Sequence, residues 1–512
     1  MVLYAGGLGE DDFAFLGVAV MRTLQVTAPV VAPGTKRDVP AIGFEPRQSR
    51  SPPPTPSPDH GSRVWRALRN VAVLSFAFLL HASAHGGTVG MQSSVNAAES
   101  AGTAALAVAS ATAWAAGCAV AGVGPLRNLA SGKWALAVSL LAAAPYTATT
   151  TMLPDVVSLL PAAAMQGVAT AVLWASHGAY LAAWESELGR SSAGKLSYIM
   201  FFVAVHSGDV CGNLLMSTVL SLDHPPLPSN FSKAVPCGFD FCLPPADNSD
   251  GNLVRPPQRR LSQVGYAFLA CVAAASLLVA LFLDPVKRVR CEERRRITDS
   301  AEDGPCLEKP THVAVLSQMG SPYQMLLVPI TLFAGMEEAF LHTDFTQAYV
   351  ACSVGISHLG YVMACYAVAS GVGAVISCFA SGYLAEGRAT LLVIGAALHG
   401  GLVIVMIVWS PQSEHPYSLF FIASLWGLCD ALWKTQINVI YEAFFPDDPT
   451  TAMVVLWLWE SAGYALGCGL SVPLCTGVKL HSLLVTLVLG LIGYSVVECC
   501  LGQHCKGRKV YK

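Results

Sequence analysis

The chain has 512 residues, of which 54% are hydrophobic and only 12% are charged. The formal net charge of -3 at pH 7 is small, so the sequence gives no reason to expect nucleic acid as a partner. A mean hydropathy of +0.52 is far above what a water-soluble domain needs to fill its core, and it indicates an integral protein of the lipid bilayer.

Residues 1–62 differ from the rest of the chain, because they end in the proline- and serine-rich run PRQSRSPPPTPSPDHGS. Such a composition buries too little apolar surface to fold. We therefore predict a disordered cytosolic tail over residues 1–62.

The remainder of the chain contains segments long enough to cross a membrane. A bilayer core of about 30 Å needs about 20 apolar residues per helix, and twelve segments meet this length. They run over residues 67–88, 101–123, 134–153, 156–184, 196–222, 263–283, 323–343, 356–384, 389–410, 417–443, 452–475 and 480–501.

The cationic residues indicate which loops face the cytosol. Short loops rich in lysine and arginine stay on the cytosolic side. In this chain, lysine and arginine residues precede the first segment, follow even-numbered segments and occur in the tail after the last segment. We therefore expect both termini to be cytosolic.

The long loop 223–262 falls on the opposite side and carries two further signals. Its sequon at Asn230 predicts glycosylation. Cys237 and Cys242 stand close together in CGFDFC. In an oxidising compartment this spacing favours a local disulfide between the two, and two free thiols are the alternative.

The order of these parts predicts the architecture. Two sets of six helices joined by a basic linker are typical of an all-α membrane protein with the major facilitator fold, whose halves are a parallel repeat. The loops GPLRNLASGK and GYLAEGR stand at equivalent places in the two halves and resemble the cytosolic loop motif Gly-x-Leu-Ala-Asp-Arg-x-Gly-Arg-Arg of this superfamily. In the first copy, Asn128 stands at the position of the aspartate of the motif. The predicted parts are an N-terminal half over 63–284, a cytosolic linker over 285–320, a C-terminal half over 321–502 and a basic cytosolic tail over 503–512.

Charged residues inside the predicted helices are candidates for function, because each costs about 2.5–3.5 kcal/mol at the bilayer centre. Asp430 and Lys434 stand one turn apart, and Glu460 of the next helix lies at the same depth by helix rise. One hypothesis is a three-membered charged cluster with a proton or cation site. The alternative is a structural bridge beside a protonated Glu460.

Two further polar groups have two interpretations each. Glu337, Glu338 and Asp344 are predicted to line an outer vestibule that attracts cations, or to reach water from a helix end. His206 and Asp209, one turn apart, are predicted to form a satisfied polar pair at a packing seam, or a proton relay.

Catalytic motifs are missing from the sequence. It contains no phosphate-cradling glycine loop with its lysine, no nucleophile elbow and no zinc-binding His-Glu-x-x-His. We therefore expect neither an enzyme nor a cofactor, and the sequence predicts no metal site.

The segment LWGLCDALWKTQINVIY (425–441), with LRNVAVLSFAFLL (68–80) and LWESAGYALG (458–467), resembles the unc-ninety-three family of the major facilitator superfamily, and most of all its A-type branch. Lys434 departs from that branch, where glutamine is commoner. The family-motif residues are Trp426, Gly427, Asp430, Trp433, Thr435, Gln436, Asn438 and Tyr441.

This resemblance implies a regulatory or trafficking partner of another membrane protein, either a potassium channel or a receptor. The alternative is a proton- or cation-coupled carrier of a small solute. The expected location is the plasma membrane rather than an endosome.

Overall fold

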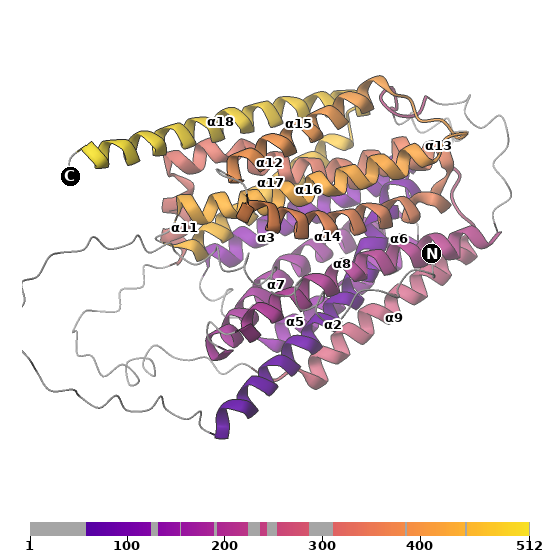
Figure 1. Ribbon diagram of the computed structural model, residues 1–512. Helices are drawn as coiled ribbons and strands as arrows, with labels where there is room; N and C mark the ends of the chain where they lie inside the picture. The colour runs from indigo at the N-terminus through magenta and orange to yellow at the C-terminus, as the bar shows by residue number, and fades with distance from the viewer. Residues whose placement is uncertain are drawn as a thin grey trace, which may run out of the picture.

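The computed structural model describes residues 58–123, 132–153, 155–188, 192–223, 236–242, 253–285, 311–383, 387–445 and 448–510. Within these ranges the chain is built from helices that lie side by side in one bundle (Figure 1). Nine helices of the described part are long and apolar enough to cross a membrane. The all-helical membrane architecture expected from the sequence is therefore confirmed.

The N-terminal helices follow the predicted segments, with one exception. The expected helix over 134–153 is two short helices, which meet at Ala142 and Ala143. Pro145 near the start of the second cannot donate a backbone hydrogen bond, which explains the break. The N-terminal helices are α2 (Pro58–Val95), α3 (Ala101–Gly122), α5 (Lys133–Leu141), α6 (Ala144–Thr151), α7 (Val156–Leu188), α8 (Ser192–Leu220) and α9 (Gln258–Phe282).

As a set, the C-terminal helices begin before the first predicted segment of this half and end after the last one. A short helix lies inside the predicted linker, and the last helix continues through the predicted tail. The C-terminal helices are α11 (Thr311–Met319), α12 (Pro322–Phe340), the π-helix η4 (Leu341–Ala351), α13 (Cys352–Val354), α14 (Leu359–Tyr383), α15 (Gly387–Val408), α16 (Tyr417–Phe444), α17 (Pro449–Ser471) and α18 (Thr476–Val510).

Glycines bring the helices around the site into close contact. A Cβ atom on Gly212 of α8 would lie 1.9 Å from the backbone oxygen of Ser83 in α2, and one on Gly208 would lie 2.4 Å from that of Leu79. The small-xxx-small spacing of Gly208 and Gly212 therefore allows α8 and α2 to pack closely along this seam.

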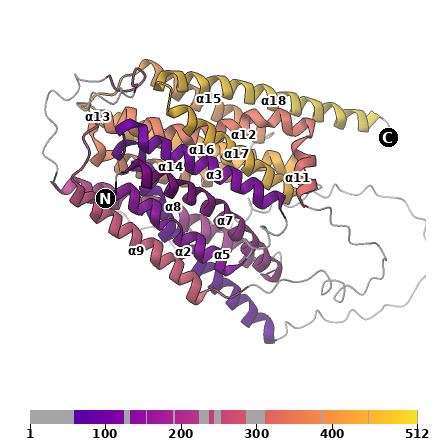
Figure 2. The same cartoon turned by 180° about the vertical axis from the view of Figure 1, so that it is seen from behind.

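The N-terminal and C-terminal helices touch at both ends of the bundle. At one end Ser93 of α2 lies 3.1 Å from Thr346 of η4, hydroxyl to hydroxyl, and Gln347 donates to the backbone oxygen of Ser93 at 2.9 Å. Toward the other end α3 packs against α17, as Figure 2 shows. Residues of both sets of helices line the cavity that contains the candidate site.

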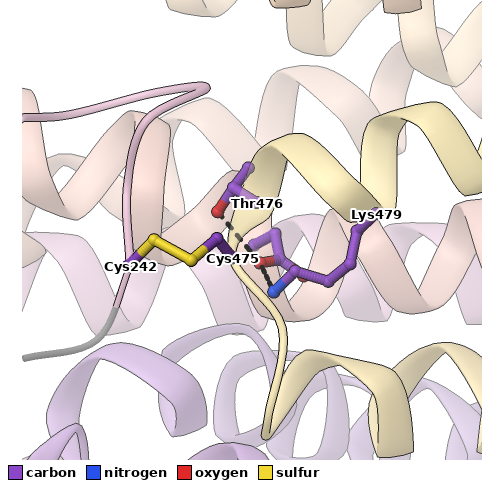
Figure 3. Close-up of a disulfide and its surroundings, with 5 residues drawn as sticks. Cys242, Cys475, Thr476 and Lys479 are labelled. Atoms are coloured by element: carbon purple, nitrogen blue, oxygen red, sulfur yellow. Dashed lines mark hydrogen bonds and ion pairs between the residues drawn. A yellow bond between two sulfur atoms is a disulfide. The ribbon is translucent and has the colours of Figure 1, made fainter.

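The described segment 236–242, which we call the strap, is bonded covalently to the C-terminal helices. Cys237 forms a disulfide with Cys352 of α13, and Cys242 forms one with Cys475 before α18 (Figure 3). The Gly238 amide also donates to the backbone oxygen of Ala348 at 2.9 Å.

The predicted disulfide between Cys237 and Cys242 is therefore wrong, although both residues are oxidised. The strap crosses the end of the bundle where α13 and the turn before α18 lie, so each cysteine meets a partner from another part of the chain. The predicted glycosylation site, Asn230, lies outside the described residues, as do Asn128, residues 1–57 and residues 286–310.

Candidate functional site

A cavity of about 380 Å³ lies between the N-terminal and the C-terminal helices. Small-molecule sites commonly measure about 300–1,000 Å³, so this volume suits a small ligand. The titratable side chains that line the cavity are His81, His85, Tyr146, His206, Asp209, Glu338, His342, Tyr366, Asp430, Lys434 and Tyr464.

Lys434 links two acids on the C-terminal side of the cavity. Its Nζ lies 3.1 Å from Asp430 Oδ1 and 3.2 Å from Glu338 Oε2. The other oxygen of Asp430 accepts hydrogen bonds from the Tyr366 hydroxyl at 2.9 Å and from Ser370 at 3.1 Å. Asp430, only 1% exposed, is thus held rigidly by α14 and by its own helix.

The second acid in direct contact with Lys434 is Glu338 rather than the predicted Glu460. Among the described residues, Lys434 forms ion pairs with Asp430 and Glu338 alone, and Glu460 does not line the cavity. The helical rise gives the depth of a residue but not the direction of its side chain. Glu338 therefore takes the direct contact predicted for Glu460, which interacts with Lys434 only at longer range.

Behind Asp430 lies a second, fully buried group of polar residues. Glu337 accepts a hydrogen bond from the indole of Trp426, and the indole of Trp433 donates to His399 Nδ1 at 3.1 Å. The side chains of Glu337 and Asp430 lie close together in this buried group.

The predicted outer vestibule of Glu337, Glu338 and Asp344 is not formed. Glu337 faces the protein interior, and Glu338 faces the central cavity. Asp344 lies in a separate cavity of about 80 Å³ beneath the disulfide of Cys242. Adjacent residues of a helix point in different directions, which sequence proximity hides.

Asp344 is fully satisfied where it lies. It forms an ion pair with Lys479 and accepts a hydrogen bond from Thr476 at 3.2 Å, and Figure 3 labels both of these partners. It also accepts a hydrogen bond from Ser471 at 2.8 Å. Its role is therefore structural, at the junction of η4, α17 and α18. Lys479, the single lysine just before the apolar segment 480–501, was the sequence signal that Asp344 has a basic partner.

His206 and Asp209 both line the cavity, but no hydrogen bond joins them within the described residues. The seam with α2 is made by Gly208 and Gly212 instead, so the predicted polar pair at a packing seam is wrong. Asp209 reaches over α2, since a Cβ on Gly86 would lie 2.7 Å from its Oδ1.

Sequence reasoning missed much of the N-terminal wall. Gln166 of α7 lies 3.4 Å from His85, and His85 stacks on His81 with ring centroids 5.6 Å apart. Across the cavity, His342 lies 3.2 Å from the hydroxyl of Tyr464. The available signal was an isolated polar residue on an otherwise apolar helix. Within the described residues no group of three or more metal-ligating side chains is placed to hold a metal ion.

Most family-motif residues have structural contacts that explain them. A Cβ on Gly427 would lie 2.4 Å from the backbone oxygen of Tyr366, which brings α16 against α14. Gln436 donates to Ser377 at 3.0 Å, and Tyr441 accepts from Gln324 at 2.7 Å. The remaining motif members Thr435 and Asn438 donate to backbone oxygens of their own helix.

Solved structures of membrane transporters share this fold. The nucleoside transporter NupG is 12% identical, with a TM-score of 0.55 over 83% of this chain and 98% of that chain. A bacterial homologue of the human lysosomal transporter Spinster is 14% identical, with a TM-score of 0.51 over 86% and 96% of the two chains. The molecule is thus a helical membrane protein with the fold of major facilitator transporters.

Sequence comparisons define the family within this class. The model of the ion channel regulatory protein UNC-93 matches residues 94–497. Protein unc-93 homolog A of Danio rerio is 30% identical over 443 residues, which are 85% of this chain and 92% of that protein. The putative potassium channel regulatory protein unc-93 of Caenorhabditis elegans is 28% identical over 361 residues, or 67% and 49% of the two chains. The chain belongs to the UNC-93 family, as the resemblance predicted.

Proposed function

We propose that this protein is a regulatory partner of a potassium channel. The observation that carries the proposal is the match to the ion channel regulatory model over residues 94–497. The relative from Caenorhabditis elegans that bears the potassium channel name is similar over 67% of this chain. The other form of this regulatory role is that of a trafficking partner of a receptor.

The two disulfides of the strap favour a regulatory role over transport. A carrier must separate its two halves at each end in turn. Cys237 and Cys242 are tied to Cys352 and Cys475, so the strap resists separation at its end of the bundle. A regulatory subunit needs only a stable surface in the membrane.

We further infer a topology of twelve spans in two six-helix halves, with α5 and α6 together forming the third span. Disulfides persist in oxidising compartments, which supports an extracellular strap. Both termini are then cytosolic, and the protein functions at the plasma membrane.

The test is proximity labelling by the full chain in cells, followed by recording of potassium current. We expect a potassium channel subunit to be enriched and its current to change when the chain is co-expressed. Asp430→Asn, which changes a residue of the cavity and not of the outer surface, should leave both results intact when surface abundance holds. If no channel is enriched and currents are unchanged while the protein reaches the cell surface, the proposal fails.

The cavity supports a second candidate, proton- or cation-coupled transport of a small solute. Both sets of helices line the cavity, and acids and histidines face it. In proteoliposomes, Asp430→Asn should then abolish accumulation of the solute. A solute that accumulates against its gradient, with no effect of the chain on any potassium current, would favour this candidate.

A further inference from the structure

The charges of the cavity do not balance. Three acids line it, namely Asp209, Glu338 and Asp430, against one base, Lys434. That base is already paired with the two acids of the C-terminal helices. An ionised group inside a membrane protein needs a partner or water, so the excess of acids favours a cation in the cavity.

Asp209 is the acid without a partner. Within the described residues its carboxylate has no hydrogen bond and no ion pair, and it faces the cavity from α8. Lys434, on the C-terminal side, is occupied by its own two carboxylates. A ligand that enters the cavity can therefore meet an unpaired carboxyl group on its N-terminal side.

Buried neutral groups around the cavity also lack partners. Tyr146, Gln166, Asn213 and His81 line it and are all more than nine-tenths buried. In the described part of the chain, the hydroxyl of Tyr146, Oε1 of Gln166, Oδ1 of Asn213 and Nδ1 of His81 have no hydrogen-bond partner. The two amide oxygens can only accept, so a ligand rich in donors would satisfy them.

Aromatic rings complete the lining. Phe78, Trp174, Tyr366 and Tyr464 border the same cavity. The faces of such rings attract organic cations. The described residues place no group of three or more metal-ligating side chains to hold a metal ion, so an organic cation fits the lining better.

We propose that the central cavity binds a small protonated amine, with Asp209 as its anionic anchor and Gln166 and Asn213 as acceptors of its N–H groups. The proposal does not depend on channel regulation. It deepens the transport candidate by naming its ligand class, but it requires binding only.

The test uses the full chain in lipid nanodiscs and ligands that differ only in their head group. Each of tyramine, tryptamine and pentylamine is measured beside its alcohol and its carboxylic acid, namely tyrosol and 4-hydroxyphenylacetate, tryptophol and indole-3-acetate, pentanol and pentanoate. The readouts are equilibrium dialysis and the midpoint of thermal unfolding. We expect at least one amine to bind and to raise the midpoint, whereas its matched alcohol and acid do not.

Variants identify the anchor. Asp209→Asn keeps the size of the side chain and should lower amine affinity about tenfold or more, since it removes a charge-assisted hydrogen bond. Asp155→Asn makes the same chemical change at an exposed position outside the cavity and should leave affinity unchanged.

Three outcomes would overturn the proposal. They are failure of all three amines to bind to protein that still unfolds cooperatively, preference for the acids, and amine binding that Asp209→Asn does not weaken. Dialysis needs neither a channel nor flux, so these outcomes are separate from those that test the proposed function.

Discussion

The ammonium group of Lys434 forms ion pairs with two carboxylates, those of Glu338 and Asp430. Its ammonium group is 3.1 Å from one carboxylate and 3.2 Å from another, and its side chain is 38% exposed, toward the cavity. Removing one partner of a fully buried ion pair costs about 3–5 kcal/mol. The exposure of Lys434 sets the expected cost below that range, because water reaching the cavity can solvate the remaining acids.

Lys434→Gln should therefore lower the thermal unfolding midpoint, because Glu338 and Asp430 are left facing each other without a cation. Adding Glu338→Gln removes one of the two uncompensated acids and should recover part of the loss. Arg66→Gln, at an exposed position, is the matched control and should have little effect. A double variant less stable than Lys434→Gln alone would contradict this account of the cluster.

Trp426 satisfies a buried acid through its indole N–H. Trp426→Phe keeps most of the ring volume but leaves an oxygen of Glu337 without its donor, which costs about 1–3 kcal/mol. The measurement is chemical or thermal unfolding of the purified protein, with Trp65→Phe at a position 71% exposed as the control. Equal stability of the two variants would mean that another group satisfies Glu337.

At the scale of the helix, contact between α8 and α2 depends on the absence of a side chain. Gly212→Ala would place a methyl group 1.9 Å from a backbone oxygen, which cannot move aside without shifting the helix. Overpacking costs about 1–3 kcal/mol, and this contact belongs at or above the upper end of that range. We expect a smaller fraction of monodisperse protein in size-exclusion chromatography.

Gly401→Ala provides the control, because a Cβ there meets no other atom within 4 Å. The two variants make the same change in helices of the same bundle, so helix propensity cannot separate them. If both behave like the unsubstituted protein, the seam between α8 and α2 adapts more easily than its geometry indicates.

The helices themselves were largely predictable, since a bilayer requires long apolar segments and the chain supplies them. Pro145 was visible, yet the break between α5 and α6 was not predicted, because the apolar run continues through it. The arrangement of side chains in the candidate site was harder to predict. Glu337 and Glu338 are neighbours in sequence, but one faces the interior and the other the cavity, and only packing against α16 decides which.

Cysteine pairing could not be predicted for a related reason. The strap cysteines are close in sequence, but their partners are 115 and 233 residues away. Pairing over such separations depends on how the C-terminal helices pack, and no spacing rule reports this packing.

At the scale of the whole molecule, the strap joins the N-terminal part of the chain covalently to the C-terminal part. A protease site inserted within residues 286–310 would separate Cys237 and Cys242 from Cys352 and Cys475. After cleavage, we expect one band on a denaturing gel without reductant and two bands with it.

Serine substitution of Cys352 and Cys475 together should give two bands in both conditions. Either single substitution leaves one disulfide and should keep the fragments joined. Two bands from the unsubstituted protein without reductant would instead support the local pair Cys237–Cys242.

The long reach of these disulfides also orders events during synthesis. Cys475 is made 233 residues after Cys242, which at roughly 5–20 residues per second is a delay of about 10–50 s. Through this interval the strap thiols are available to the wrong partners, including each other, and such mistakes are corrected by thiol–disulfide exchange. The second disulfide therefore closes only on a chain that has been translated as far as its last helix, so its presence distinguishes nearly complete molecules from truncated ones.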